Sequence, residues 1–224
     1  MKIFKINSYI AIVIAFFTIV KFSYSSEVCY KVRYLFIEVG KLCIEYKIKN
    51  GKIFSYAEAK TTGIVKLLKD IEYKGKSIAS LDYKPEKFFF FQKERNLKII
   101  HQYIFNKNEV LYKKIKNKKE EIKKINIGKK EFFDAFTAGL YIFKEKSPQE
   151  KKIKVFFNGK LQDVKYRITK TDKDKIIRIT AKVNVEGLIK PTGEWKVYIR
   201  NGNLYPYKME IKIRIGEVEI YRYR

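Results

Sequence analysis

Histidine, cysteine and proline are scarce in this sequence. Its 224 residues include one histidine, His101, two cysteines, Cys29 and Cys43, and four prolines. Zinc sites usually need three or four nitrogen or sulfur ligands, so we expect no metal site. One imidazole without a serine or cysteine in a nucleophile motif does not make a catalytic triad. His101 is therefore expected to be an ordinary strand residue, beside Ile99 and Tyr103.

Motifs of nucleotide and hydrolase chemistry are also missing. The sequence contains no G-x-G-x-x-G, no G-K-[ST] and no nucleophile elbow. Glu120 and Glu121 lie among lysines and are typical of a solvated surface rather than of paired catalytic carboxylates. We therefore expect no enzymatic activity and no cofactor.

The N-terminus resembles an export signal. Lys2 and Lys5 precede an apolar run over residues 9–20, and small residues allow cleavage after Ser25 or Ser26. The run is short for a membrane span, which needs about 20 residues. The alternative is an uncleaved N-terminal anchor. We expect a signal peptide at 1–25 and one β-rich domain at 26–224, exported to the periplasm or cell envelope, because no linker rich in Pro, Gly or Ser divides the chain.

Acidic residues are few beside the basic ones. The chain has 50 Lys and Arg against 24 Asp and Glu, a formal charge of +26, and removal of the signal with its three lysines leaves +23. Such a charge attracts polyanions. It is also typical of a compositional bias that places lysine on every solvated face. For an exported protein the natural polyanions are anionic lipids or cell-wall polymer, and we expect no nucleic acid partner.

The two cysteines leave the question of a disulfide open. Export permits a disulfide between Cys29 and Cys43. However, a first hairpin turning near Gly40 would place Cys43 opposite a residue well after Cys29. The sequence favours two unbonded cysteines over a disulfide.

Alternation of apolar and charged residues predicts strands, and three Asn-Gly pairs predict tight hairpins. Asn50-Gly51, Asn158-Gly159 and Asn201-Gly202 suit the two positive-φ positions of a type I′ turn. The first turn predicts three cross-strand pairs on one apolar face, namely Ile48 with Ile53, Tyr46 with Ser55 and Ile44 with Ala57.

A closing hairpin is predicted at the C-terminus. A turn at Gly216-Glu217 would pair Ile215 with Val218 and Ile213 with Ile220, and would set Arg214 against Glu219. Other strand candidates are 32–37, 87–92, 97–105, 109–115, 153–157, 161–169, 175–186 and 195–200.

Residues 107–130 hold ten lysines and admit two interpretations. An exposed edge hairpin turning near Asn117-Lys118 is favoured over a charged helix, because lysine on an edge strand prevents edge-to-edge aggregation.

One segment, "EFFDAFTAGLYIF", predicts a helix. Asp134 is expected to be its N-cap and Ala135 its first residue, with an end between Phe143 and Lys146. Phe136, Leu140 and Phe143 form one apolar stripe. Gly139 costs about 1 kcal/mol against Ala inside a helix, which indicates close packing there. A lone amphipathic helix in a chain of strands is expected to fill or cover the concave face of a curved sheet.

The order of several motifs resembles a known family. These are "YKVRYLFIEVGKLCIEY", "SLDYKPEKF", "FFDAFTAGLYIF", "GLIKPTGEWKVYI" and "LYPYKMEIKIRIGEVEIY". Together they resemble the bacterial family of exported proteins catalogued as domain of unknown function 3108, over residues 28–223. Gly40, Asp134, Gly193 with Trp195, and Pro206 match its motifs in order and spacing.

The chain departs from that family at two places. Thr137 stands where the family's Asp-x-x-Ser helix start has serine, and phenylalanines flank Asp134. The resemblance implies a curved antiparallel sheet and supplies no activity.

These features predict a mainly β fold, a large curved antiparallel sheet or half-open barrel around one central amphipathic helix. The first function hypothesis is a non-enzymatic binding or carrier module for a lipid or acyl chain. Its expected ligand-binding residues are Phe89, Phe91, Phe132, Phe136, Leu140 and Phe143. The alternative is an interaction protein that docks its basic face onto anionic envelope polymer or lipid.

Overall fold

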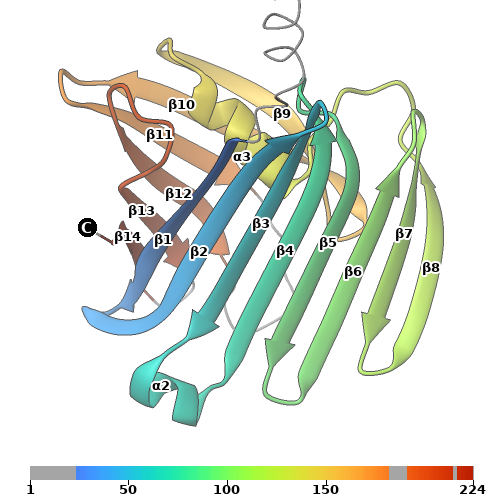
Figure 1. The fold of residues 1–224 in the computed structure, drawn as a ribbon, viewed down its shortest axis with the longest axis horizontal. Coiled ribbons are helices and arrows are strands. Elements are labelled where there is room, and N and C mark those ends of the chain that lie inside the picture. The colour runs from blue at the N-terminus through green and yellow to red at the C-terminus, as the bar shows by residue number, and fades with distance from the viewer. Residues whose placement is uncertain (1–23, 182–190, 214–215, 224) are drawn as a thin grey trace, which may run out of the picture.

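One antiparallel sheet of fourteen strands makes up most of the chain (Figure 1). The computed structural model describes residues 24–181, 191–213 and 216–223. The strands are β1 (Tyr24–Tyr34), β2 (Ile37–Lys49), β3 (Lys52–Thr61), β4 (Ile71–Ser80), β5 (Pro85–Glu94), β6 (Leu97–Phe105), β7 (Glu109–Lys116), β8 (Lys119–Asn126), β9 (Gln149–Phe157), β10 (Lys160–Lys170), β11 (Asp174–Ala181), β12 (Pro191–Arg200), β13 (Lys208–Ile213) and β14 (Glu217–Arg222). The helices are α2 (Gly63–Leu68) and α3 (Ala135–Lys144). The expected fold class is confirmed.

The order of strands in the sheet follows the order in the sequence, except at the centre, where β1 lies beside β14. Every strand pairs with its neighbours in sequence except β8 and β9, which do not pair with each other, and the first and last strands, β1 and β14, are paired. The two edges of the sheet are therefore β8 and β9, which are joined in sequence by the segment that contains α3. The sheet is strongly bent, and α3 lies inside the bend, beside β9 and β4 (Figure 1).

The bend brings the two ends of the sheet together in what we call the aromatic junction. It comprises the buried residues Phe88, Tyr103, Phe105, Val110, Tyr112, Ile127 and Phe156. The turn between β9 and β10 reaches this cluster, where the amide of Asn158 donates to the Tyr103 hydroxyl at 3.1 Å. Gly159 has φ +74°, and a Cβ there would lie 2.8 Å from the Tyr112 ring. Only glycine therefore fits at this contact.

Two of the three Asn-Gly predictions are confirmed. Ile48, Tyr46 and Ile44 pair with Ile53, Ser55 and Ala57, as expected. Phe157 pairs with Lys160 across Asn158-Gly159. The third is wrong, because Asn201-Gly202 starts a longer connection between β12 and β13. There the Asn203 amide donates to the Arg200 carbonyl at 3.0 Å and only Gly202 has positive φ, as in a type II turn.

The first hairpin corrects the expectation about the cysteines. The turn lies at Leu35-Phe36, whose φ angles are 47° and 68°, and not near Gly40. A bulge then shifts the register between Val32 and Arg33 by one residue. This shift sets Cys29 opposite Cys43, with their Cα atoms 4.1 Å apart, and the two form a disulfide. The candidate strand 32–37 thus contains a turn.

The C-terminal hairpin has a different register from the one expected. Val218 faces Ile211 and Ile220 faces Met209, while Glu219 faces Glu210. The loop is longer than two residues, and the Ile213 amide donates to the Gly216 carbonyl at 3.1 Å. The expected partners of Ile213 and Val218 are therefore wrong, and Ile215 and Arg214 lie outside the described residues. The displacement is an even number of residues, so Val218 and Ile220 still face inward.

The lysine-rich segment forms the expected edge hairpin. Its turn is Asn117-Lys118, with φ angles of 46° and 74°, and β8 is an edge strand with mostly exposed residues. The other edge is partly covered, because Phe133 pairs with β9 in parallel.

Some expectations fall outside the described residues. Residues 1–23 of the expected signal peptide are not described, whereas its last two expected residues, Tyr24 and Ser25, belong to β1. The candidate strand 175–186 is described only as far as Ala181. The remaining strand candidates are confirmed within a few residues, whereas α2 was not predicted. No helix in the described ranges is long and apolar enough to cross a membrane.

Candidate functional site: an apolar cavity beside helix α3

Helix α3 is held at its start by its own first turn and by the sheet. The Asp134 carboxylate accepts hydrogen bonds from the amides of Phe136 and Thr137 at 2.8 and 2.9 Å. The Asp134 amide donates to the Thr137 hydroxyl at 2.9 Å, which completes a capping box. The Ser77 hydroxyl of β4 donates to the second carboxylate oxygen. The predicted N-cap is confirmed, and the Thr137 hydroxyl is part of the capping box.

Asp134 is fully buried. Burial raises the pKa of its carboxyl above the ordinary value, against the opposing effect of the hydrogen bonds from Ser77 and the two amides. All of these hydrogen bonds lie within the fold, so the carboxylate is explained by its position at the helix start.

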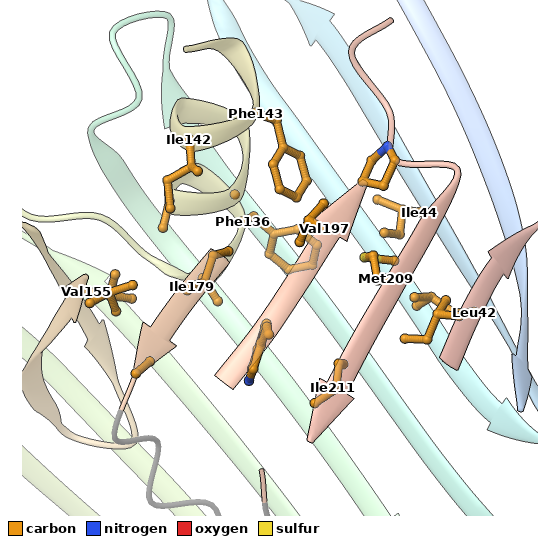
Figure 2. A pocket seen from close by; sticks show the side chains of 18 of the residues that line it. Leu42, Ile44, Phe136, Ile142, Phe143, Val155, Ile179, Val197, Met209 and Ile211 are labelled. Carbon is orange, nitrogen blue, oxygen red and sulfur yellow. The ribbon is translucent and has the colours of Figure 1, made fainter. Parts of the chain in front are cut away.

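A cavity of about 370 Å³ lies between α3 and the inner face of the sheet (Figure 2). Its walls come from α3, from β9–β14 and from β1 and β2. They are mostly aliphatic and aromatic: Leu42, Ile44, Phe136, Ile142, Phe143, Val155, Ile179, Val197, Met209 and Ile211 are labelled in Figure 2. A volume near the lower end of the range for small-molecule pockets can hold part of a flexible chain.

Small residues leave this space open. Ala135, Ala138 and Gly139 of α3 and Ala181 of β11 line the cavity. A Cβ added to Gly139 would have the Phe143 ring as its nearest contact, at 3.9 Å. The expectation of close packing at Gly139 is therefore wrong, because this glycine faces the hollow.

The few polar groups of the wall are uncharged. They belong to Tyr30, Tyr46, Gln162, Trp195 and Tyr205, and the described lining residues include no Lys, Arg, His, Asp or Glu. The Gln162 side-chain amide donates to the Phe157 carbonyl at 3.0 Å. The rings of Tyr46 and Tyr205 stack at 6.0 Å. Although the chain has a formal charge of +26, this wall carries no charge and would suit an apolar ligand better than an anion.

The structure brings only some of the expected site residues together. Phe136 and Phe143 line the cavity, whereas Leu140 is buried in α3 without lining it. Phe132 packs in the aromatic junction, with its ring 5.4 Å from that of Phe105.

Phe89 and Phe91 lie on the opposite face of the sheet. They pair with Lys76 and Lys74 of β4, and the Lys98 ammonium lies 5.7 Å from the Phe91 ring. Phe88 and Phe90 are the inward residues of this strand, because they pack in the aromatic junction. The expectation that Phe89 and Phe91 face the concave side is therefore wrong, and the adjacent residues Phe88 and Phe90 face it instead.

Sequence reasoning missed the wall built by the ends of the chain. Val197, Met209, Ile211 and Ile220 line the cavity opposite α3. Their alternation with charged residues marks one inward face, but only the pairing of β14 with β1 shows that this face meets Leu42 and Ile44.

The other side chains that could take part in catalysis or metal binding have structural roles. His101 Nδ1 lies 2.9 Å from the Tyr112 hydroxyl, in keeping with a buried strand histidine. Two groups of potential metal ligands occur among the described residues. One contains the disulfide sulfurs, which are not available to a metal, and the other is the cluster Glu210, Glu217 and Glu219, where Lys208 contacts two of the carboxylates.

The residues that carried the family resemblance surround the cavity or fix the backbone near it. Trp195 and Pro206 line it. A Cβ at Gly40 would lie 2.5 Å from the Lys60 carbonyl oxygen. Gly193 has φ +107°, and its Cβ would lie 2.8 Å from the carbonyl oxygen of Ala181, another wall residue.

Comparisons with known proteins agree with the fold. A crystal structure described as a beta-barrel-like protein of domain of unknown function DUF1849 from Brucella abortus superposes with a TM-score of 0.59 at 9% identity. The match covers 90% of this chain and 96% of that one. No curated protein matches the sequence. A family profile described as protein of unknown function (DUF3108) matches residues 29–222, and the chain therefore belongs to the DUF3108 family.

Proposed function

We propose that this protein is a non-enzymatic binding or carrier module that holds a lipid or acyl chain in the cavity beside α3. The observation that carries the proposal is the hollow itself, about 370 Å³ with an almost wholly apolar wall. Apolar surface facing an unfilled space loses both dispersion contacts and the benefit of burial. A hydrophobic ligand would restore both.

The proposed cellular location rests on the N-terminal pattern of Lys2, Lys5 and the apolar run at 9–20. We propose export to the periplasm or cell envelope, where a carrier of insoluble chains would meet membrane lipids. The disulfide between Cys29 and Cys43 supports this, because disulfides persist in oxidising compartments.

The first experiment tests for a bound lipid. The purified full chain would be extracted with organic solvent, and the extract analysed by mass spectrometry beside an equal amount of an unrelated exported protein. We expect alkyl-chain compounds at near-stoichiometric amounts in this extract alone. Protein that contains no lipid and also takes up no neutral hydrophobic dye would contradict the proposal.

A chain-length series measures the depth of the site. Each buried methylene contributes about 0.8 kcal/mol, or about fourfold in Kd. Displacement of the neutral dye Nile red by n-alcohols should therefore strengthen about fourfold per carbon until the cavity is full, and then level off. A series without such a plateau would indicate non-specific adsorption.

The alternative, docking through a basic face, makes a different prediction. Binding to anionic vesicles would weaken steeply as salt rises, because exposed charges are screened. Some lysines of the edge hairpin form ion pairs with carboxylates, such as Lys113 with Glu120 at 2.8 Å and Lys123 with Glu121 at 2.5 Å. The cavity therefore supports the carrier proposal more specifically than the lysines support docking.

A further inference from the structure

A row of hydroxyl groups crosses four neighbouring strands beside the cavity. Ser26 of β1 lies opposite Tyr46 of β2, Tyr46 opposite Ser55 of β3, and Ser55 opposite Ser77 of β4. Residues directly opposite one another in a sheet point to the same face. Tyr46 lines the cavity, so this hydroxyl row lies on the inner face.

Both ends of the hydroxyl row are fixed by the fold. At one end the hydroxyls of Ser26 and Tyr205 share a hydrogen bond. Tyr205 lines the cavity and stacks on Tyr46. At the other end Ser77 donates to Asp134, at the start of α3. The row therefore joins the cavity wall to the first turn of the helix.

One hydroxyl of the cavity wall and one of the hydroxyl row are buried and have no hydrogen-bond partner among the described residues. Among the described residues, the side-chain oxygens of Tyr30 and Ser55 make no hydrogen bond. Tyr30 is fully buried and lines the cavity. Ser55, which is 4% exposed, is the member of the hydroxyl row between Tyr46 and Ser77. Buried polar groups in native proteins are nearly always hydrogen-bonded, so the Tyr30 hydroxyl in the cavity wall is available to a polar atom of a ligand.

The polar atom that fits here is uncharged. The described cavity wall has no cation, and the buried carboxylate of Asp134 lies at the end of the hydroxyl row. An anionic head group would therefore find no cation in the described wall and a carboxylate at the end of the hydroxyl row, which is costly. Arg222 faces Tyr30 across the β1–β14 pair, but it is exposed and is not a wall residue.

We propose that the cavity holds a neutral lipid, an alcohol or ester on a single alkyl chain, whose oxygen hydrogen-bonds the Tyr30 hydroxyl beside the hydroxyl row. This inference rests on the proposed function and specifies its ligand class. The chain occupies the aliphatic part of the wall, and the oxygen lies at the tyrosine end.

Four probes that share a twelve-carbon chain test the ligand class. Dodecanol, methyl dodecanoate, dodecanoate and the hydrocarbon dodecane would compete with Nile red at pH 8 on the purified full chain, after passage over a lipid-removing resin. We expect the alcohol and the ester to bind at least tenfold more tightly than dodecanoate. Dodecanoate binding as tightly as the alcohol would overturn this inference and leave the carrier proposal standing. Displacement by none of the four would overturn both.

The Tyr30→Phe variant tests the hydrogen bond. We expect about tenfold weaker binding of dodecanol, binding of dodecane within twofold of the original, and an unchanged or higher Tm, because the lost hydroxyl has no hydrogen-bond partner among the described residues. Unchanged binding of dodecanol would overturn the assignment.

Tyr166→Phe is the matched control. Tyr166 is 1% exposed and its hydroxyl also lacks a partner among the described residues, but it is not a wall residue. This variant should bind all probes as before, and a loss of dodecanol binding equal to that of Tyr30→Phe would overturn the assignment. If Tyr30→Phe does not fold, the comparison of dodecanol with dodecanoate on the unaltered chain remains the test, with the expected and contradicting results given above.

Discussion

The aromatic junction and the cavity are two parts of one concave surface, filled in different ways. In the junction large rings meet closely: the ring of Phe156 lies 5.7 Å from that of Tyr103 and 5.9 Å from that of Phe105. Beside α3 the wall instead carries Ala135, Ala138 and Gly139 toward the same interior. One region is solid and the other is hollow.

This difference shows that the curvature of the sheet does not by itself create the cavity. The same bent sheet is closed by aromatic side chains where β9 and β10 reach β5–β7. The cavity is present because the face of α3 that lines it carries the small residues Ala135, Ala138 and Gly139. It can therefore be filled or enlarged by substitution without altering the closure of the sheet.

The largest expected effect comes from removing one ring from each region. Phe156 is fully buried in the aromatic junction, so Phe156→Ala should cost about 3–5 kcal/mol of unfolding free energy. Phe143 is half-buried against the hollow, and Phe143→Ala should cost about 1 kcal/mol, since it loses only part of the burial energy of a phenylalanine. Urea unfolding of both variants measures the comparison. Equal losses would mean that the two regions are equally well packed.

Substitutions at two glycines distinguish crowding against the aromatic junction from backbone strain alone. Gly159→Ala adds a Cβ 2.8 Å from the Tyr112 ring at a positive φ, whereas Gly51→Ala adds one at a positive φ with nothing within 4 Å. Strain alone should cost about 1–2 kcal/mol at Gly51. Crowding should add about 1–3 kcal/mol at Gly159. Thermal melts of the pair test this, and equal shifts in Tm would show that the turn does not press on the junction.

A substitution in the hollow should stabilise the protein. Gly139→Ala should gain about 1 kcal/mol from helix propensity, because its new methyl group meets nothing closer than 3.9 Å. Urea unfolding would show the gain. A loss of stability would mean that the space beside Gly139 is already filled.

A pH-dependent effect on stability is expected from Asp134, at the start of α3. Burial raises the folded-state pKa of this carboxyl above its unfolded value of about 3.9. The native state then holds its proton longer, so stability falls as pH rises through the interval between the two values. Asp134→Asn should remove this contribution. The stability of the wild type relative to the variant should decrease from pH 3.5 upward and then level off, and a constant difference in urea midpoints would contradict this.

Local features could be predicted from the sequence because their causes are local. The register around Asn50-Gly51 depends on the turn and on alternation in the two flanking strands, and both agreed. The start of α3 depends on Asp134 and the first turn after it. These predictions needed no knowledge of distant segments.

Registers that differ by an even number of residues could not be distinguished. Alternation places Val218 and Ile220 inward in both the expected and the observed C-terminal hairpin, so the pattern fits either. The disulfide was missed for a related reason. The turn at Leu35-Phe36 has no Asn or Gly to mark it, and the bulge after it adds one residue that alternation does not reveal.

The candidate site was only partly predictable. Phe136 and Phe143 were identified through the apolar stripe of the helix. The strand segment "KFFFFQ", residues 87–92, has phenylalanine on both faces and so does not show which face is inward. The far wall of the cavity depends on the pairing of β1 with β14, a contact between the two ends of the chain. Such pairing is decided by the whole fold.

The most direct test of the account compares Gly139→Leu with Gly139→Ala in the same dye-displacement assay. The leucine side chain would extend into the hollow, whereas the alanine methyl group would leave most of it open. We predict that both variants are at least as stable as the original and that only Gly139→Leu binds dodecanol at least tenfold more weakly. Undiminished dodecanol binding by a stable Gly139→Leu variant would contradict the central claim that this cavity is the ligand site.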